Sequence, residues 1–349
     1  MNLAIVILNY NGKALLEQFL PSVLEYSQQA TVYVADNAST DGSGAYIKEH
    51  FSKVHLIINT QNGGYAKGYN DALAHLKEDV FVLLNSDVEV TQGWLTPIIE
   101  AFKATSNLVA VQPKILDYKN KDYFEYAGAG GGYIDALGYP YCRGRIFNTL
   151  EKDTGQYNDT RQIFWASGAC LALEKEAFVK AGGFDEDLFA HQEEIDLCWR
   201  MQQQGGIIHY IGDSTVYHIG GATLAVENPK KTFYNFRNSL LVMLKNNNHA
   251  AVWAILFTRM LLDALAAWQF LVSGKPSHFF AVFKAHLSFY SLAPKFIKKR
   301  NKHAKKIGYY QIKSIVWMYF IRKKTTFIAL NRIKEVKMLV NCLGVKDNK

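Results

Sequence analysis

The N-terminal third of the chain alternates short apolar segments with amphipathic ones, and this alternation restricts the fold more than any other feature. The apolar segments are rich in Val, Ile and Leu and are bounded by turn residues, as is typical of strands buried on both faces. They comprise residues 3–8, 31–35, 54–58 and 80–84. Apolar residues at helical spacing follow each of them, in residues 14–26, 44–50, 66–76 and 94–104. The alternation predicts an α/β fold with a mainly parallel sheet flanked by helices.

A polar motif follows each of the four predicted strands. The motifs are Asn9-Tyr10-Asn11, Asp36-Asn37, Asn62-Gly63-Gly64 and Asn85-Ser86-Asp87. The carboxyl ends of parallel strands lie at one edge of a sheet, and ligands of such sheets bind beyond that edge. We therefore expect the four motifs to form a single crevice.

Two aspartates of this predicted crevice have both a structural and a functional interpretation. Asp87 directly follows a buried strand, where its carboxylate could hold a hard cation against phosphate oxygens or cap the next turn. Asp36 also ends a strand, where it could accept an N–H group from a nucleotide base or stabilise the turn that follows.

A second group of acidic residues opens a helix predicted over residues 193–204. Acidic residues favour a helix N-terminus, and this explains one or two of the three carboxylates at Glu193, Glu194 and Asp196. Adjacent carboxylates also repel each other, and crowding in a cleft raises the pKa of at least one, as a general base requires. A further strand is predicted over residues 207–211. His218 ends a later apolar run and is either a buried structural residue or a ligand.

Composition and missing motifs exclude several classes of protein. With 49% apolar and 20% charged residues, the chain is neither disordered nor fibrous. Its four cysteines are far apart and form no Cys-x-x-Cys pair, which argues against a disulfide scaffold or a zinc ribbon. The sequence has no phosphate-binding P-loop motif and no Gly-x-Gly-x-x-Gly after a strand, so a P-loop NTPase and a dinucleotide dehydrogenase are disfavoured.

The C-terminal part of the chain is strongly basic. Residues 294–349 contain 16 Lys and Arg against 2 Asp and Glu, whereas residues 1–293 contain 23 and 29. Such a segment suits an anionic partner. Residues 250–272 form an apolar stretch that Arg259 and Asp263 interrupt, so we predict an interfacial or core helix there and not a membrane span. We also predict a long irregular loop over residues 117–161.

Together, these motifs resemble glycosyltransferase family 2, whose members have the GT-A nucleotide-diphospho-sugar transferase fold. The resemblance covers roughly residues 1–225 and is strongest to bacterial rhamnosyltransferase-like members. Three further motifs carry it, namely Gly182-Gly183-Phe184-Asp185-Glu186, the acidic segment from Glu193 to Arg200, and His218-Ile219-Gly220-Gly221. It implies a GT-A catalytic domain over residues 1–228, followed by a helical, basic region over residues 229–349.

The resemblance also implies a role for each motif. Asp36 would accept the pyrimidine N–H of a UDP or dTDP donor, and Asp87 and His218 would hold Mg²⁺ or Mn²⁺. Glu194 would be the catalytic base. The remaining residues of the nucleotide crevice would be Asn9, Asn11, Asn37, Gly64, Asn70 and Ser86. Three residues would orient the acceptor and hold the start of the acidic helix, namely Glu193, Asp196 and Arg200.

The implied reaction is the inverting transfer of one sugar from a nucleotide-sugar donor to a hydroxyl of a glycan or lipid-linked acceptor in cell-surface polysaccharide biosynthesis. We expect a cytoplasmic enzyme, peripheral on the inner face of the plasma membrane, whose basic and aromatic region contacts the anionic membrane surface. We expect no nucleic acid as a partner. The main alternative is a catalytically inactive relative that binds a glycan or nucleotide without turnover. A sugar nucleotidyltransferase is disfavoured, because its Gly-rich, Arg-containing loop is replaced by Asn9-Tyr10-Asn11-Gly12.

Overall fold

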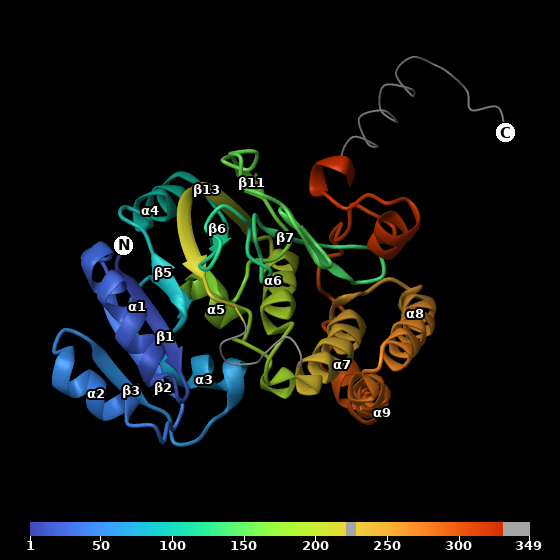
Figure 1. Ribbon diagram of the computed structural model, residues 1–349, viewed down its shortest axis with the longest axis horizontal. Helices are drawn as coiled ribbons and strands as arrows, with labels where there is room; N and C mark the ends of the chain where they lie inside the picture. The colour runs from blue at the N-terminus through green and yellow to red at the C-terminus, as the bar shows by residue number, and fades with distance from the viewer. Residues whose placement is uncertain (221–227, 331–349) are drawn as a thin grey trace, which may run out of the picture.

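The computed structural model describes residues 1–220 and 228–330, and within them nine strands form one mixed sheet (Figure 1). Eight strands follow the order β11-β13-β6-β12-β4-β1-β2-β3, and β5 pairs with β13. The four N-terminal strands of the sheet are parallel and confirm the predicted ones. They are β1 (Leu3–Asn9), β2 (Thr31–Asp36), β3 (His55–Ile58) and β4 (Val80–Asn85). Their carboxyl ends therefore share one edge.

The second half of the sheet begins with an antiparallel strand, β12, inserted between β4 and β6. Next to β6 runs β13, a twelve-residue strand that extends the segment predicted over 207–211 as far as His218. The strands of this half are β5 (Val88–Val90), β6 (Leu108–Asp117), β11 (Thr160–Gln162), β12 (Cys170–Glu174) and β13 (Ile207–His218). The end of β13 pairs with β5, which places His218 opposite Val88, one residue after Asp87.

Helices cover both faces of the sheet, and alternate residues of β1 show the two layers. Leu3, Ile5 and Ile7 pack in one apolar cluster with α1, α2 and α4, whereas Ala4 and Val6 belong to a second cluster with α3, α5 and α6. The helices of the first layer are α1 (Lys13–Tyr26), α2 (Ser43–His50) and α4 (Leu95–Ala104). Those of the second are α3 (Gly64–Leu73), α5 (Lys175–Lys180) and α6 (Glu193–Gln203). The predicted helices are thus confirmed, with end positions that differ by a few residues.

Residues 117–161 are not the irregular loop that we predicted. They contain a second, four-stranded antiparallel sheet in the order β10-β9-β8-β7, and many of their side chains are buried. Its strands are β7 (Gly132–Ile134), β8 (Pro140–Cys142), β9 (Arg145–Ile146) and β10 (Thr149–Leu150). Strands of two or three residues are too short for an alternating apolar pattern to reveal them.

Beyond residue 228 the described chain is mainly helical. Asn228 caps the first of these helices by accepting the backbone N–H of Lys230. The long helices are α7 (Pro229–Asn246), α8 (Val252–Val272) and α9 (Pro276–Lys298), and a short helical turn, η2, follows at Trp317–Ile321. Leu240 of α7 and Phe289 of α9 belong to the same buried cluster as the layer containing α6. The domain boundary between residues 228 and 229 stays a prediction, and residues 331–349 of the basic segment lie outside the described residues.

Candidate active site

The ends of β1 and β2 form a polar corner at the predicted edge. Asn9 and Asp36 are paired in register, and Asn9 Nδ2 donates to Asp36 Oδ1 over 2.9 Å. The same amide lies 3.0 Å from Ser43 Oγ at the start of α2, and Asp36 Oδ2 accepts the backbone N–H of Ser39. Both predicted side chains are buried. The Asp36 carboxylate is therefore held in one orientation at the end of the sheet.

Asn11, Asn37 and Gly64 extend this corner. Asn11 Oδ1 accepts the backbone N–H of Thr40, and Asn37 Nδ2 donates to the carbonyl oxygen of Gly64 over 3.0 Å. Gly64 has φ +72°, and a Cβ there would lie 2.6 Å from the carbonyl oxygen of Phe189. Glycine is therefore required at this position, because the start of α3 touches the segment that precedes α6.

Asp87 and His218 meet at the adjacent strand end. His218 Nε2 lies 3.1 Å from Asp87 Oδ1, and both side chains are buried. The other ring nitrogen, Nδ1, lies 3.3 Å from Glu125 Oε2, although the geometry is not that of a hydrogen bond. Burial lowers the pKa of His218, but the carboxylates of Asp87 and Glu125 outweigh it and raise this pKa to about 10.

A carboxylate oxygen and an imidazole nitrogen that face each other at this distance fit a divalent cation such as Mn²⁺ or Mg²⁺. In the described residues, no group of three or more His, Cys, Asp and Glu side chains is arranged around a metal position. The pair would therefore leave the remaining coordination positions to oxygens from a ligand or water. Metal binding needs a neutral imidazole, so a cation would compete with the proton on Nε2.

Glu193 and Glu194 begin α6 after an unusual backbone segment. Phe189, His191 and Gln192 all have positive φ, between 65° and 73°. Burial raises the pKa of Glu194 to about 7, although backbone amides at the helix start lower it. Burial also raises the pKa of Glu193 well above its usual range, and the neighbouring charge of Glu194 adds to this effect. A carboxyl with a pKa near 7 suits a general base at neutral pH.

This helix start is connected to the crevice through the start of α3. The backbone N–H of Tyr65 donates to the Phe189 carbonyl over 2.9 Å, and Gly64, beside it, contacts Asn37 of the polar corner. The segment that leads into Glu193 and Glu194 therefore borders the crevice. A position of Glu194 beside the Asp87–His218 pair stays a prediction.

The comparisons with known proteins identify the family of the chain. The family model of Glycosyl transferase family 2 matches residues 4–181. The chain belongs to glycosyltransferase family 2. It is 28% identical over 235 residues to an N-acetylglucosaminyl-diphospho-decaprenol L-rhamnosyltransferase of Mycobacterium tuberculosis. The aligned region covers 62% of this chain and 75% of that protein. It is 23% identical over 261 residues to the dTDP-rhamnosyl transferase RfbF of Shigella flexneri, with 70% and 81% covered.

Solved structures confirm the GT-A fold of this glycosyltransferase. The S. aureus TarS 1–349 structure has a TM-score of 0.54 at 14% identity and covers 86% of this chain and 83% of that one. A mannosyltransferase from Pyrobaculum calidifontis, in complex with GDP-Man and Mn²⁺, has a TM-score of 0.51 at 16% identity, with 85% and 83% covered. At these identities the likeness shows the fold alone.

Two predicted acceptor residues of the glycosyltransferase have a different position. Asp196 has no exposed surface, and its carboxylate binds Lys245, Asn246 and Arg200. These partners hold its pKa well below the usual range against the effect of burial. Because both oxygens are occupied, we do not retain Asp196 as a residue that contacts an acceptor. Arg200 also donates to the carbonyl of Gly183, so the Asp196–Arg200 pair links α6 to the turn around Gly183.

Asn70 and Ser86 complete the predicted set. Asn70 donates to the Phe184 carbonyl and accepts the Phe184 N–H, so it fixes the Gly182-Gly183-Phe184 turn. Its amide also donates to Glu186 Oε1 over 3.2 Å, and a place in the nucleotide crevice stays a prediction. Ser86, between Asn85 and Asp87, lies at the carboxyl end of β4 beside the corner formed by β1 and β2.

Glu125 and Asn238 are site residues that the sequence analysis missed. A Cβ at Gly220 would lie 2.6 Å from Glu125 Oε1, so the glycine after His218 makes room for this carboxylate. Asn238 of α7 is fully buried, and its amide lies 2.7–2.9 Å from the carbonyls of Leu188, Ala190 and His191. It therefore supports the segment with positive φ that precedes Glu193. No sequence motif marks either residue.

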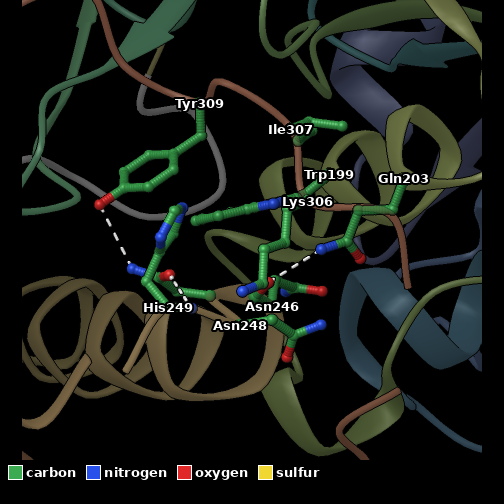
Figure 2. Close-up of a pocket in the computed structure, with 9 residues that line it drawn as sticks. Trp199, Gln203, Asn246, Asn248, His249, Lys306, Ile307 and Tyr309 are labelled. Atoms are coloured by element: carbon green, nitrogen blue, oxygen red, sulfur yellow. Dashed lines mark hydrogen bonds between the residues drawn. The ribbon is translucent and has the colours of Figure 1, made fainter. Parts of the chain in front are cut away.

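A separate small cavity lies outside this site (Figure 2). It lies between the ends of α6 and α7 and the segment around Tyr309, and Gln203 donates to the Asn246 carbonyl at its side. Its volume is about 10 Å³, enough for about one water molecule. It contains none of the predicted site residues and is too small for a sugar.

Proposed function

We propose that this glycosyltransferase moves one sugar, with inversion, from a UDP- or dTDP-sugar to a hydroxyl of a glycan or lipid-linked acceptor in cell-surface polysaccharide biosynthesis. The observation that carries the proposal is the position of Asp36 and the Asp87–His218 pair at one edge of the sheet, with the segment before Glu194 hydrogen-bonded to the start of α3. The relatives named as rhamnosyltransferases support a deoxysugar donor, one of them by its dTDP-rhamnosyl title.

Donor binding would use the corner of β1 and β2. Asn9 and the Ser39 N–H each occupy one oxygen of Asp36, and each oxygen keeps a further lone pair for the N–H of a pyrimidine. Asp87 and His218 would hold the divalent cation, which when bound neutralises charge on the diphosphate. UDP and dTDP present the same ring N–H to Asp36, so both remain in the proposal.

Glu194 would act as the general base. Its carboxylate takes the proton of the acceptor hydroxyl, and the hydroxyl oxygen forms a bond to the anomeric carbon. The bond from that carbon to the diphosphate oxygen breaks on the opposite face, and its electron pair leaves with the nucleoside diphosphate. Base catalysis of this kind contributes about 10²–10⁴-fold to the rate. The pKa of Glu193 is raised by burial and by the charge of Glu194, which favours protonation of Glu193 over protonation of Glu194.

The proposal places the enzyme in the cytoplasm, peripheral on the inner face of the plasma membrane. A lipid-linked acceptor presents its sugar at that surface, and the basic helical region supplies the charge that an anionic bilayer attracts. Nucleic acid is not among the proposed partners.

Release of nucleoside diphosphate from a panel of nucleotide sugars, with and without Mn²⁺, tests the proposal. We expect metal-dependent turnover with a UDP- or dTDP-sugar and its loss in Asp87→Ala. The control is Glu89→Gln. Glu89 lies two residues after Asp87, and its carboxylate pairs with Lys121. Donor binding without turnover would instead identify the inactive binding relative. Metal-dependent nucleotide binding that persists in Asp87→Ala would show that another residue is the ligand.

A further inference from the structure

The outward face of α8 is apolar along its whole length. Its large exposed side chains recur every three or four residues, so they form one stripe of the helix. They are Trp253, Phe257, Leu261, Leu265, Trp268 and Val272. Within Val252–Val272, which the structure describes in full, no exposed side chain carries a charge. Among the described residues, α8 is also the one helix long and apolar enough to cross a membrane.

The two charges that interrupt α8 face the protein. Arg259 Nε binds Asp263 Oδ1 over 3.1 Å, and both side chains are buried. Arg259 also donates to the Leu137 carbonyl and lies over the ring of Tyr139, whose hydroxyl donates to Asp263. The pair is thus neutralised inside the protein. The two charges of α8 thus lie on its protein-facing side, and its solvent-facing side is left apolar.

Helix α9 continues this surface. Its exposed large apolar side chains are Phe280, Phe283, Leu287, Tyr290 and Ile297. The two helices pack together through contacts such as Tyr290 Oη to Met260 Sδ at 3.2 Å and His286 Nε2 to Asp263 Oδ2 at 3.4 Å. Figure 1 shows α8 and α9 beyond α7, on the side of the molecule away from β1–β3. We call the exposed apolar side chains of both helices the α8–α9 face.

The charged side chains of α9 and of the described chain that follows it have one sign. Residues 264–330 contain thirteen Lys and Arg and no Asp or Glu. Lys275 lies in the turn between the helices, and Lys284 and Lys298 are exposed on α9. Pairing of this face with a second copy of the chain would bring these cations together. An anionic phospholipid surface instead complements both the charge and the apolar stripe.

We propose that the α8–α9 face inserts into one leaflet of an anionic phospholipid bilayer, with both helices lying along the surface and not crossing it. This proposal rests on the proposed function and names the element that brings the crevice to a lipid-linked acceptor. An amphipathic helix of this kind buries its apolar face roughly 5–10 Å into the boundary between headgroups and acyl chains. The buried Arg259–Asp263 pair keeps the opposite side of α8 on the protein.

The α8–α9 face is also connected to the active site. Lys295 of α9 and Lys299, directly after this helix, bind Asp187 over 2.7 and 2.6 Å, and Lys299 also binds Asp185. Both aspartates belong to the turn around η1 (Glu186–Leu188), which leads through residues 189–192 into Glu193 and Glu194. An inserted hairpin would therefore hold the catalytic end of α6 at a fixed position relative to the bilayer.

Flotation of the full chain with vesicles tests this proposal. We expect it to float with phosphatidylcholine vesicles containing phosphatidylglycerol, and less with phosphatidylcholine alone. The double variant Phe257→Glu/Leu265→Glu should reduce the bound fraction at least about tenfold, since each charge would have to enter the apolar layer. The matched control is Val179→Glu on α5, because Val179 is 64% exposed and lies outside the face.

Two further measurements separate the outcomes. Donor hydrolysis and the thermal melt in solution should be unchanged in the double variant. Unchanged values would show that the variant still folds when it no longer floats. Failure of the glycosyltransferase proposal would instead appear as absent hydrolysis in the wild type, without a change in flotation. Vesicles should shift the fluorescence of the wild type to shorter wavelength, and Trp253→Phe/Trp268→Phe should remove that shift. A wild type that does not float, or a double variant that floats equally, overturns the proposal. A wild-type dimer that becomes monomeric in the double variant without lipid assigns the face to a second copy and also overturns it.

Discussion

Substitution of Glu194 by Gln should change stability and activity in opposite directions. The rise of its pKa from 4.5 to about 7, caused mainly by burial, means that ionising this carboxyl destabilises the folded protein. At about 1.4 kcal/mol per pKa unit, the full cost is about 3 kcal/mol. The neutral amide of Gln has no such cost of ionisation. It also cannot act as a base that removes the proton of the acceptor hydroxyl.

The sign of the pH dependence follows from this pKa. Below about pH 4.5, Glu194 is protonated in the folded and unfolded chains alike and contributes no difference. Between pH 4.5 and about 7 the folded chain keeps a proton that the unfolded chain has lost, so the free energy of unfolding falls as the pH rises. From pH 5.5 to 8.5 the wild type should therefore lose about 2 kcal/mol relative to Glu194→Gln.

Urea unfolding at the two pH values measures this difference, and nucleoside diphosphate release measures turnover. We expect turnover to fall by about 10²–10⁴-fold in Glu194→Gln with donor binding retained. Wild-type kcat should rise about tenfold per pH unit below pH 7 and then level off, since the base must be ionised. The control is Glu100→Gln, a change of an exposed residue on α4. Near-normal turnover, or the same pH dependence of stability in both proteins, would remove Glu194 from the role of base.

Two other substitutions address the residues that support the site. Glu125→Gln should weaken Mn²⁺ binding by about 10–100-fold, because the Glu125 carboxylate lies beside the second ring nitrogen of His218 and would orient this imidazole on the metal. Electron paramagnetic resonance of free Mn²⁺ measures the affinity, and an unchanged affinity would contradict the prediction. Asn238→Ala should lower stability by about 2–4 kcal/mol, since it leaves buried carbonyls without a donor. Asn238→Ala should also lower kcat while Mn²⁺-dependent donor binding persists. The control variant Asn248→Ala should leave kcat unchanged. A wild-type kcat in Asn238→Ala would show that Asn238 does not position Glu194.

The sequence predicted the parallel half of the sheet because its strands are continuous apolar runs with polar ends. The same pattern placed Asn9, Asp36 and Asp87 at one edge, as the structure confirms. Pairing of His218 with Asp87 depends on the twelve-residue length of β13, of which the sequence analysis recognised five residues. The resemblance to the family, and not local periodicity, connected these two residues.

The rest of the site depends on contacts between distant segments. Asn238 supports the segment before Glu193 from a helix about 50 residues later, and Glu125 reaches His218 from a region predicted as a loop. Asp196 shares the acidic helix start with Glu194, yet it points inward to Lys245. Sequence spacing places all three acidic residues at the same helix start, whereas the packing of α6 against α7 shows that Asp196 faces the protein interior.

The backbone of residues 189–192 has a consequence for synthesis of the protein. Three non-glycine residues with positive φ are strained and persist only when other groups hold them in place. Much of that support comes from Asn238, which leaves the ribosome well after Glu194. A nascent chain can thus complete the nucleotide corner while its base still lacks a fixed position. We expect such a chain to bind donor without consuming it, so that chemistry begins only when translation has supplied α7.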